Sequence, residues 1–270
     1  MKNALLAGLL LFSCGMLAAQ TPAVSTPIDA KTARTHEIGP HRHYIPMKGI
    51  GHGYHELELT LQISAEGKVV NAKADGDANL LALWPMLKPE VMSWRYRPFE
   101  QEGYAVPVTV LAGLQLVPPE QLPMHHVQPP AVKPDSVVSI ALSKTECYGT
   151  CPSFTVELKT TGGIAYFGRS YVVKKGVYEE KADPDAIRAL ARKLIAADFY
   201  SMDDEYRAMV TDLPTTTLSI TIDGREKHVE DYAGLWTGMP VAVKELEDEV
   251  YEFSGARKWV EGNGSEQRRR

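Results

Sequence analysis

A proline-rich segment limits how this chain can fold more than any other feature of its sequence. Residues 118–134 read PPEQLPMHHVQPPAVKP, with six prolines in 17 residues and no hydrophobic period. Proline lacks the backbone donor that helices and central strands need. We therefore predict a semi-rigid extended linker over residues 119–135 that couples its neighbours little, with a separately folding domain on each side.

Composition supports two ordinary folded domains. The 270 residues are 44% hydrophobic and 23% charged, enough to bury one large core or two modest ones. The formal net charge of -5 is opposite to that of a typical nucleic-acid binder, so we expect no nucleic-acid partner.

The first 20 residues have the layout of a secretory signal peptide. Lys2 precedes an uncharged stretch over residues 4–19, which is shorter than the roughly 20 apolar residues of a spanning helix. We therefore predict a signal peptide over residues 1–20 and a periplasmic or secreted chain. A second reading remains open, because the segment LFSC resembles a bacterial lipobox. Lipidation of Cys14 would make the chain an envelope lipoprotein, and only then would it contact a membrane.

The region before the linker has the pattern strand, strand, helix, strand. Residues 57–63 alternate strictly between apolar and polar side chains, AEGK at residues 65–68 forms a turn, and VVNAKA returns as the partner strand. Apolar residues at helical spacing follow from Asp77, although Pro85 and Pro89 are expected to break or restart that helix. YAVPVTVLAGLQL is predicted as one long final strand.

These motifs resemble the C-terminal domain of TonB-family proteins over residues 40–118. The pattern W-[RK]-[FY]-x-P followed by a glycine turn is carried by Trp94, Arg95, Tyr96, Pro98 and Gly103. We assign residues 36–118 to this domain. The resemblance implies a sheet edge that binds a peptide or an envelope protein by strand addition, without the anchor and long spacer of an energy transducer. Trp94, Arg95 and Tyr96 are the candidate binding residues, with core packing as the alternative for the two aromatic rings.

The region after the linker, residues 136–260, is predicted to be α+β. Alternating strands surround a cysteine-containing turn, Asp183 and Pro184 start a helix, and Asp223-Gly224 marks a hairpin. A last helix starts at Pro240 with four residues directed inward: Val243, Leu246, Val250 and Phe253. The predicted fold class is thus α+β, with two small domains that each pack an antiparallel sheet against one or two helices. Residues 261–270 are predicted to be a disordered tail.

Cys147 and Cys151 are the two cysteines that remain if the signal peptide is cleaved. An even pair in an oxidising compartment favours a disulfide, and a separation of four residues permits one. Two alternatives stay open: a thiol-based, copper-type metal or redox site with His228 as a further ligand, and a reduced inert pair. The C-Y-G-x-C-P motif resembles that of a bacterial domain family of unknown function, over about residues 136–260, and implies no activity.

No catalytic motif stands out in this sequence. Several histidines lie close together, but their spacing matches no rigid metal site, so we interpret them as surface residues: His36, His41, His43, His52 and His55. We predict an exported cell-envelope protein that binds a peptide or protein, is not an enzyme and holds no cofactor. The alternatives are the metal or redox protein, and a hydrolase with a dispersed site in which Asp212, Tyr171 and Glu179 would be examined first.

Overall fold

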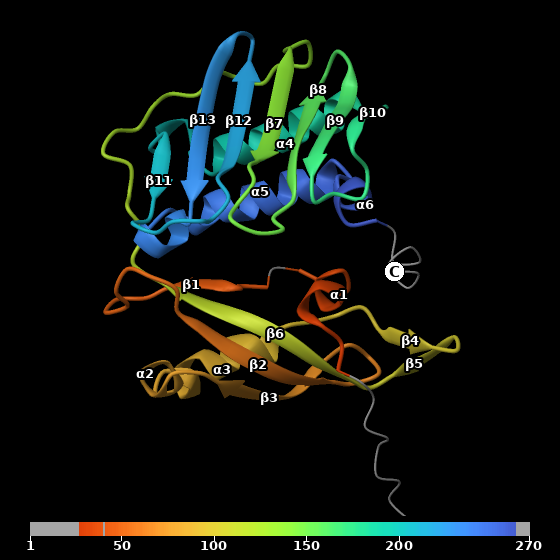
Figure 1. The fold of residues 1–270 in the computed structure, drawn as a ribbon, viewed down its shortest axis with the longest axis vertical. Coiled ribbons are helices and arrows are strands. Elements are labelled where there is room, and N and C mark those ends of the chain that lie inside the picture. Colours follow the sequence, from red (N-terminus) through yellow and green to blue (C-terminus); the bar gives the residue numbers. More distant parts are fainter. Residues whose placement is uncertain (1–26, 40, 263–270) are drawn as a thin grey trace, which may run out of the picture.

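The computed structural model describes residues 27–39 and 41–262 and contains two large β-sheets, each with its own hydrophobic core, and one small two-stranded sheet (Figure 1). The predicted signal peptide, Cys14 and residues 263–270 of the predicted tail lie outside the described residues. The structure confirms the α+β class, because antiparallel pairing dominates both sheets and each packs with helices.

The first sheet has four strands in the order β1-β6-β2-β3. They are β1 (Tyr44–Pro46), β2 (Glu56–Ile63), β3 (Val69–Asp75) and β6 (Val108–Val117). The predicted hairpin is present, and the alternation of β2 buries Leu57, Leu59, Leu61 and Ile63 as expected. Gly67 in its turn has φ +80°, and an added Cβ would lie 1.8 Å from the carbonyl oxygen of Tyr96, so only glycine allows this close approach.

Proline divides two of the predicted elements of this region. The helical stretch becomes α2 (Ala78–Leu81) and α3 (Trp84–Ser93), with Pro85 in the first turn of α3, whereas Pro89 lies inside α3 without ending it. The single final strand was a wrong prediction. Pro107 separates β5 (Tyr104–Val106), which pairs with β4 (Phe99–Gln101), from β6.

The second sheet has seven strands in the order β10-β9-β8-β7-β12-β13-β11. They are β7 (Val138–Lys144), β8 (Ser153–Lys159), β9 (Gly163–Ser170), β10 (Gly176–Glu180), β11 (Glu205–Arg207), β12 (Thr216–Ile222) and β13 (Arg225–Tyr232). Asp223 and Gly224 both have positive φ, as the predicted hairpin turn requires. The edge strands β10 and β11 were not predicted, because they are short and β10 is almost wholly exposed.

Helices cover one face of this second sheet (Figure 1). They are α4 (Pro184–Ala196), α5 (Val241–Phe253) and α6 (Arg257–Val260), with 3-10 turns at Phe199–Ser201 and Gly234–Thr237. Asp183 caps α4 by accepting the Asp185 N–H, as predicted. Phe253 is the exception in α5, because its side chain is 37% exposed and not inward.

The proline-rich segment carries no helix or strand, but it is not a free spacer. Val127 N–H donates to Ser201 Oγ at 2.8 Å, the Arg225 guanidinium donates to the Gln128 carbonyl at 2.7 Å, and Gln121 N–H donates to the Gly238 carbonyl at 2.7 Å. The segment is thus hydrogen-bonded along the second region, while separate folding of the two regions stays a prediction.

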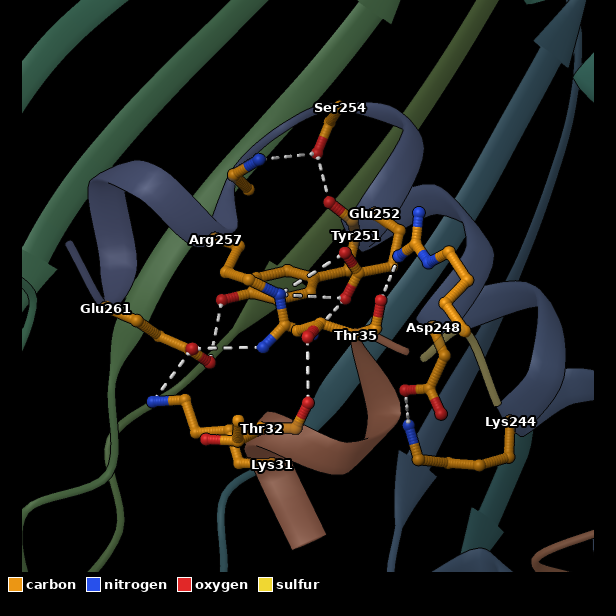
Figure 2. A network of polar contacts seen from close by, with 12 residues as sticks. Lys31, Thr32, Thr35, Lys244, Asp248, Tyr251, Glu252, Ser254, Arg257 and Glu261 are labelled. Atoms are coloured by element: carbon orange, nitrogen blue, oxygen red, sulfur yellow. Dashed lines mark hydrogen bonds and ion pairs between the residues drawn. The ribbon is translucent and has the colours of Figure 1, made fainter. Parts of the chain in front are cut away.

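The two sheets meet through α5 and α6. Figure 2 shows α1 (Ala30–Arg34) beside these helices, where Lys31 Nζ lies 2.8 Å from Glu261 Oε2. Glu261 also accepts from Arg257 and from the Tyr251 hydroxyl. The junction is thus lined with ion pairs.

Among the described residues, no helix combines the length and the apolar character needed to cross a membrane.

Candidate functional site

The two edges of the first sheet differ in whether another segment of the chain pairs with them. On the β6 side, Ile28 N–H donates to Thr109 O at 2.7 Å and Leu111 N–H donates to Ile28 O at 2.9 Å. Further along the same edge, β1 pairs in parallel with residues 115–117. Two segments of the chain itself therefore occupy this edge.

The opposite edge is β3, and no strand among the described residues pairs with its outer side. The segment containing Arg95 reaches only its beginning, where Arg95 forms an isolated bridge with Lys68. Val70 forms a bulge and is 58% exposed, and Lys73 and Asp75 are exposed. Residues 69–75 thus have no strand partner on their outer side within the described part of the chain, as in an edge strand.

The three predicted binding residues separate into two kinds. Trp94 and Tyr96 are 2% and 1% exposed, so both rings pack in the core and neither is open to a ligand stacking from solvent. The core-packing alternative describes them, because alternate residues of this segment point into the first core. Arg95 is exposed beside the open edge, and its guanidinium donates to the carbonyls of Met92, Ser93 and Trp94.

Trp94 and Tyr96 instead support a cluster of histidines. The His41 ring stacks on Trp94, with centroids 5.0 Å apart and planes 14° apart, and meets Tyr96 edge-on at 4.9 Å. The His43 ring lies 5.0 Å from Trp94. The prediction that His41 and His43 are ordinary surface residues is wrong, because their side chains are only 1% and 14% exposed.

Glu37 completes this cluster. Its Oε1 lies 3.0 Å from His43 Nε2 and 3.5 Å from His41 Nδ1. Burial raises the pKa of Glu37, but the neighbouring imidazoles of His41 and His43, in their protonated form, outweigh it and lower the pKa to about 2. Glu37, His41 and His43 form the one group of three potential metal ligands found among the described residues, with ligand atoms within 4.8 Å of one another.

Sequence reasoning missed Glu37, although the spacing E-x3-H-x-H was visible. The spacing alone does not bring the side chains together. Tertiary contacts do so: Glu37 bridges to Tyr96, and Ile38 N–H donates to Arg95 O at 2.8 Å. These bonds fold the segment between α1 and β1 against the residues that follow α3.

Unpartnered polar atoms collect around this cluster. His41 Nδ1, Trp94 Nε1 and the Tyr96 hydroxyl are buried without a hydrogen-bond partner. Burial, with a smaller contribution from the Glu37 charge, raises the pKa of Tyr96. Each buried unsatisfied group costs about 1–3 kcal/mol, so three in one place are unusual in a native protein.

Cys147 and Cys151 form the predicted disulfide, with Cα atoms 5.6 Å apart, in the loop between β7 and β8. In this oxidised form neither sulfur is a thiolate ligand. His228 lies on β13 opposite Ser219 of β12, and it does not group with the two sulfurs among the described residues. The alternative metal site made of Cys147, Cys151 and His228 is therefore not assembled.

The three residues considered for a hydrolase are dispersed. Asp212 Oδ2 accepts from Thr211, Tyr171 is 54% exposed, and Glu179 lies on the edge strand β10. No hydrogen bond or ion pair joins any two of them within the described part of the chain. A shallow groove of about 660 Å³ crosses the outer face of the second sheet, and none of the three lines it.

A buried group of charges lies on α5 at the junction. Glu247 is 2% exposed, and Lys244 Nζ lies 3.3 Å from its Oε2 while also pairing with Asp248. Burial raises the pKa of Glu247 to about 8 despite the opposing charge of Lys244. The charges of Asp248 and Glu247 outweigh the burial of Lys244 and raise its pKa.

No curated protein matches this chain. The sequence predicted a domain of unknown function in the second region, and one comparison confirms a domain of that kind there without assigning it an activity. Residues 138–254, which span the second sheet and α5, match the family model described as Domain of unknown function (DUF6438).

Proposed function

We propose that this chain is an exported cell-envelope protein whose first region binds an extended segment of another envelope protein along β3. The observation that carries the proposal is the asymmetry of the first sheet. One edge is occupied by Ile28 and β1, whereas β3 offers residues 69–75 without a partner. An open strand edge of this length supports strand addition.

Two further features support the proposal. The motif around Trp94, Arg95 and Tyr96 resembles the TonB C-terminal domain, whose sheet edge binds short peptides. The uncharged leader over residues 4–19 favours export, with lipidation at Cys14 as the alternative route to the envelope.

The exposed side chains of β3 indicate what an added strand would meet. Lys73 and Asp75 alternate along the solvent face, opposite Thr60 and Glu58 of β2. Backbone hydrogen bonds would supply affinity, and the charges of Lys73 and Asp75 would select a segment with complementary charges at alternate positions.

Peptide selection followed by hydrogen exchange tests this proposal. Peptides from a random displayed library are selected against the chain lacking residues 1–20, and amide exchange is measured with and without the best binder. We expect slower exchange over residues 69–75. The other exposed edge strand, β10, is the internal control and should not change. A binder that protects other residues and leaves β3 unchanged would contradict the proposal.

Two proline variants sharpen the experiment. Successive amides of a strand point to opposite sides, so one of Lys73→Pro and Ala74→Pro removes an outward N–H and the other removes a bond to β2. The outward variant should keep the melting temperature within a few degrees and lose peptide binding. The inward variant should lower the melting temperature. Retained binding in the stable variant would count against strand addition.

A further inference from the structure

We propose that Glu37, His41 and His43 form a binding site for one divalent transition-metal ion, with Zn²⁺ as the first candidate. This site is separate from the open edge of β3 and does not depend on the proposed peptide binding. It rests on the geometry of three side chains and on one buried nitrogen, His41 Nδ1, which makes no hydrogen bond and lies 3.5 Å from Glu37 Oε1.

The distances within the cluster suit a metal ion. Tetrahedral ligands about 2.0–2.1 Å from zinc lie about 3.3–3.4 Å from one another. Glu37 Oε1 lies 3.0 Å from His43 Nε2 and 3.5 Å from His41 Nδ1, on either side of that value. Two of the three ligand-to-ligand distances thus suit zinc, and all three ligand atoms lie within 4.8 Å of one another.

The tautomer of His41 points its free lone pair into the cluster. Its Nε2 lies 2.8 Å from the Arg95 carbonyl oxygen, a contact that requires a hydrogen on Nε2. The Arg95 N–H also lies 3.2 Å from Nε2, and it would donate to Nε2 if that nitrogen carried a lone pair. That lone pair would then face the lone pairs of the Arg95 carbonyl oxygen at 2.8 Å and repel them. Donation from Nε2–H to the carbonyl oxygen is therefore the consistent assignment. When His41 is neutral, its Nδ1 lone pair faces the Glu37 carboxylate, and a proton or a metal ion on Nδ1 relieves that repulsion.

The surroundings of the ligands resemble the outer shell of a metal site. The bond from His41 Nε2–H to a backbone carbonyl fixes ring orientation, which is the usual arrangement for a metal-bound imidazole. Trp94 and Tyr96 hold the same ring by stacking and edge contact. His41 is thus positioned in advance, and its rotamer need not be ordered when an ion binds.

The donor set selects the class of ion. Two imidazole nitrogens and one carboxylate oxygen suit Zn²⁺, Cu²⁺ or Ni²⁺, whereas Ca²⁺ and Mg²⁺ prefer oxygen ligands alone. The Glu37 and His43 side chains are 19% and 14% exposed, so the site is open on one side to an entering ion and to a water as fourth ligand. On binding, His43 would carry its hydrogen on Nδ1 and leave Nε2 for the metal.

A titration of the untagged chain with Zn²⁺ tests the proposal. Isothermal calorimetry on the chain lacking residues 1–20 should show one equivalent bound, with Mg²⁺ as the negative control. Loss of an outer-shell partner weakens metal sites about 10–100-fold, so Glu37→Gln and His43→Gln should each weaken binding by at least that factor. His55→Gln is the matched control, because His55 is outside the cluster and its Nε2 contacts the Gly51 carbonyl oxygen, and it should bind as the wild type does.

Substitution with Co²⁺ provides a readout that does not depend on the variants. A tetrahedral Co²⁺ spectrum without sulfur-to-metal charge transfer would support the Glu37 site. A sulfur band would assign the ion to Cys147 and Cys151 and overturn the proposal.

Circular dichroism of each variant confirms folding, and slower amide exchange over residues 37–46 on Zn²⁺ addition locates the ion in the wild-type chain. No saturable Zn²⁺ binding by the folded wild type would also overturn it, and would indicate a proton between His41 and Glu37.

Discussion

The two sheet regions differ in how completely they satisfy their polar groups. In the second region, Glu247 Oε1 on α5 is the one buried side-chain nitrogen or oxygen atom of the described residues without a hydrogen-bond partner. In the first region, three unpartnered atoms gather at His41, Trp94 and Tyr96, and a strand edge remains open. Unsatisfied buried groups are costly, and their concentration in the first region is the reason that we propose the metal site there.

The edges of the two sheets extend this comparison. The first sheet has four strands, and β1 and Ile28 close one of its edges. The second sheet ends in the short strand β11 on one side and the exposed β10 on the other. A small sheet with one long unpaired edge is suited to accept a strand, whereas the second region derives its stability from a larger core covered by α4 and α5.

The largest expected effect is in the core of the first region. Trp94→Ala removes a buried indole and should lower the free energy of unfolding by about 3–5 kcal/mol. It should also weaken Zn²⁺ binding, because Trp94 holds His41. Urea unfolding followed by segment-resolved hydrogen exchange measures the loss in each region. Trp84→Ala is the control, because Trp84 is only half-buried, and it should cost less. An equal loss of unfolding free energy in Trp94→Ala and Trp84→Ala would contradict the prediction that Trp94 contributes more to the core than Trp84.

The next largest effect is expected in the pH dependence of the free energy of unfolding, and its cause is the buried Glu247 at the junction. The pKa of Glu247 is raised from an unfolded value of about 4.3 to about 8, so the folded chain keeps a proton that the unfolded chain releases. Its contribution to stability is complete below about pH 4 and is lost as pH rises to about 8, at no more than about 1.4 kcal/mol per pH unit. Urea unfolding at several pH values measures this slope.

Glu247→Gln should remove that slope, because glutamine does not titrate. Glu249→Gln on the same helix is the control, since Glu249 is only half-buried and pairs with Lys193, and it should keep the wild-type slope. An unchanged slope in Glu247→Gln would show that another group causes the pH dependence.

A moderate effect is expected from the disulfide in the second region. The loop it closes is short, so the double change Cys147→Ser with Cys151→Ser should cost about 2 kcal/mol. The melting temperature should fall by a few degrees without unfolding the chain. Thiol counting on the denatured, non-reduced chain lacking residues 1–20 should find no free thiol. Two free thiols would mean that the pair is reduced and inert.

The smallest effect is expected at the ion pairs between the regions. Lys31 is 51% exposed and pairs with Glu261, so Lys31→Met should cost only about 0.2–1 kcal/mol, and less at high salt. Thermal melts at low and high salt measure the difference, with Lys48→Met, an exposed lysine of the same region, as the control. A loss well above this range would show that Lys31 holds the regions together.

Local sequence patterns determined much of the fold by themselves. The alternation of β2, the cap at Asp183 and the turn at Asp223-Gly224 depend on residues a few positions apart, so they could be predicted without the structure. The cysteine pair belongs to the same class, since four residues of spacing and the expected compartment favoured its disulfide. Proline positions were visible too, but their consequences at Pro89 and Pro107 depended on neighbouring strands and helices.

Only the tertiary structure decided the features that matter for function. The bond between His41 and Arg95 joins residues 54 positions apart, and without it the spacing of Glu37, His41 and His43 specifies no site. The hydrogen bonds of the linker to Ser201 and Gly238 likewise join residues that are far apart in the sequence, so the sequence alone did not predict them. Long-range pairing also places Ile28 and β1 on the β6 edge of the sheet and leaves β3 as the edge without a strand partner among the described residues. Strand pairing and side-chain clustering of this kind depend on long-range contacts, which local periodicity does not encode.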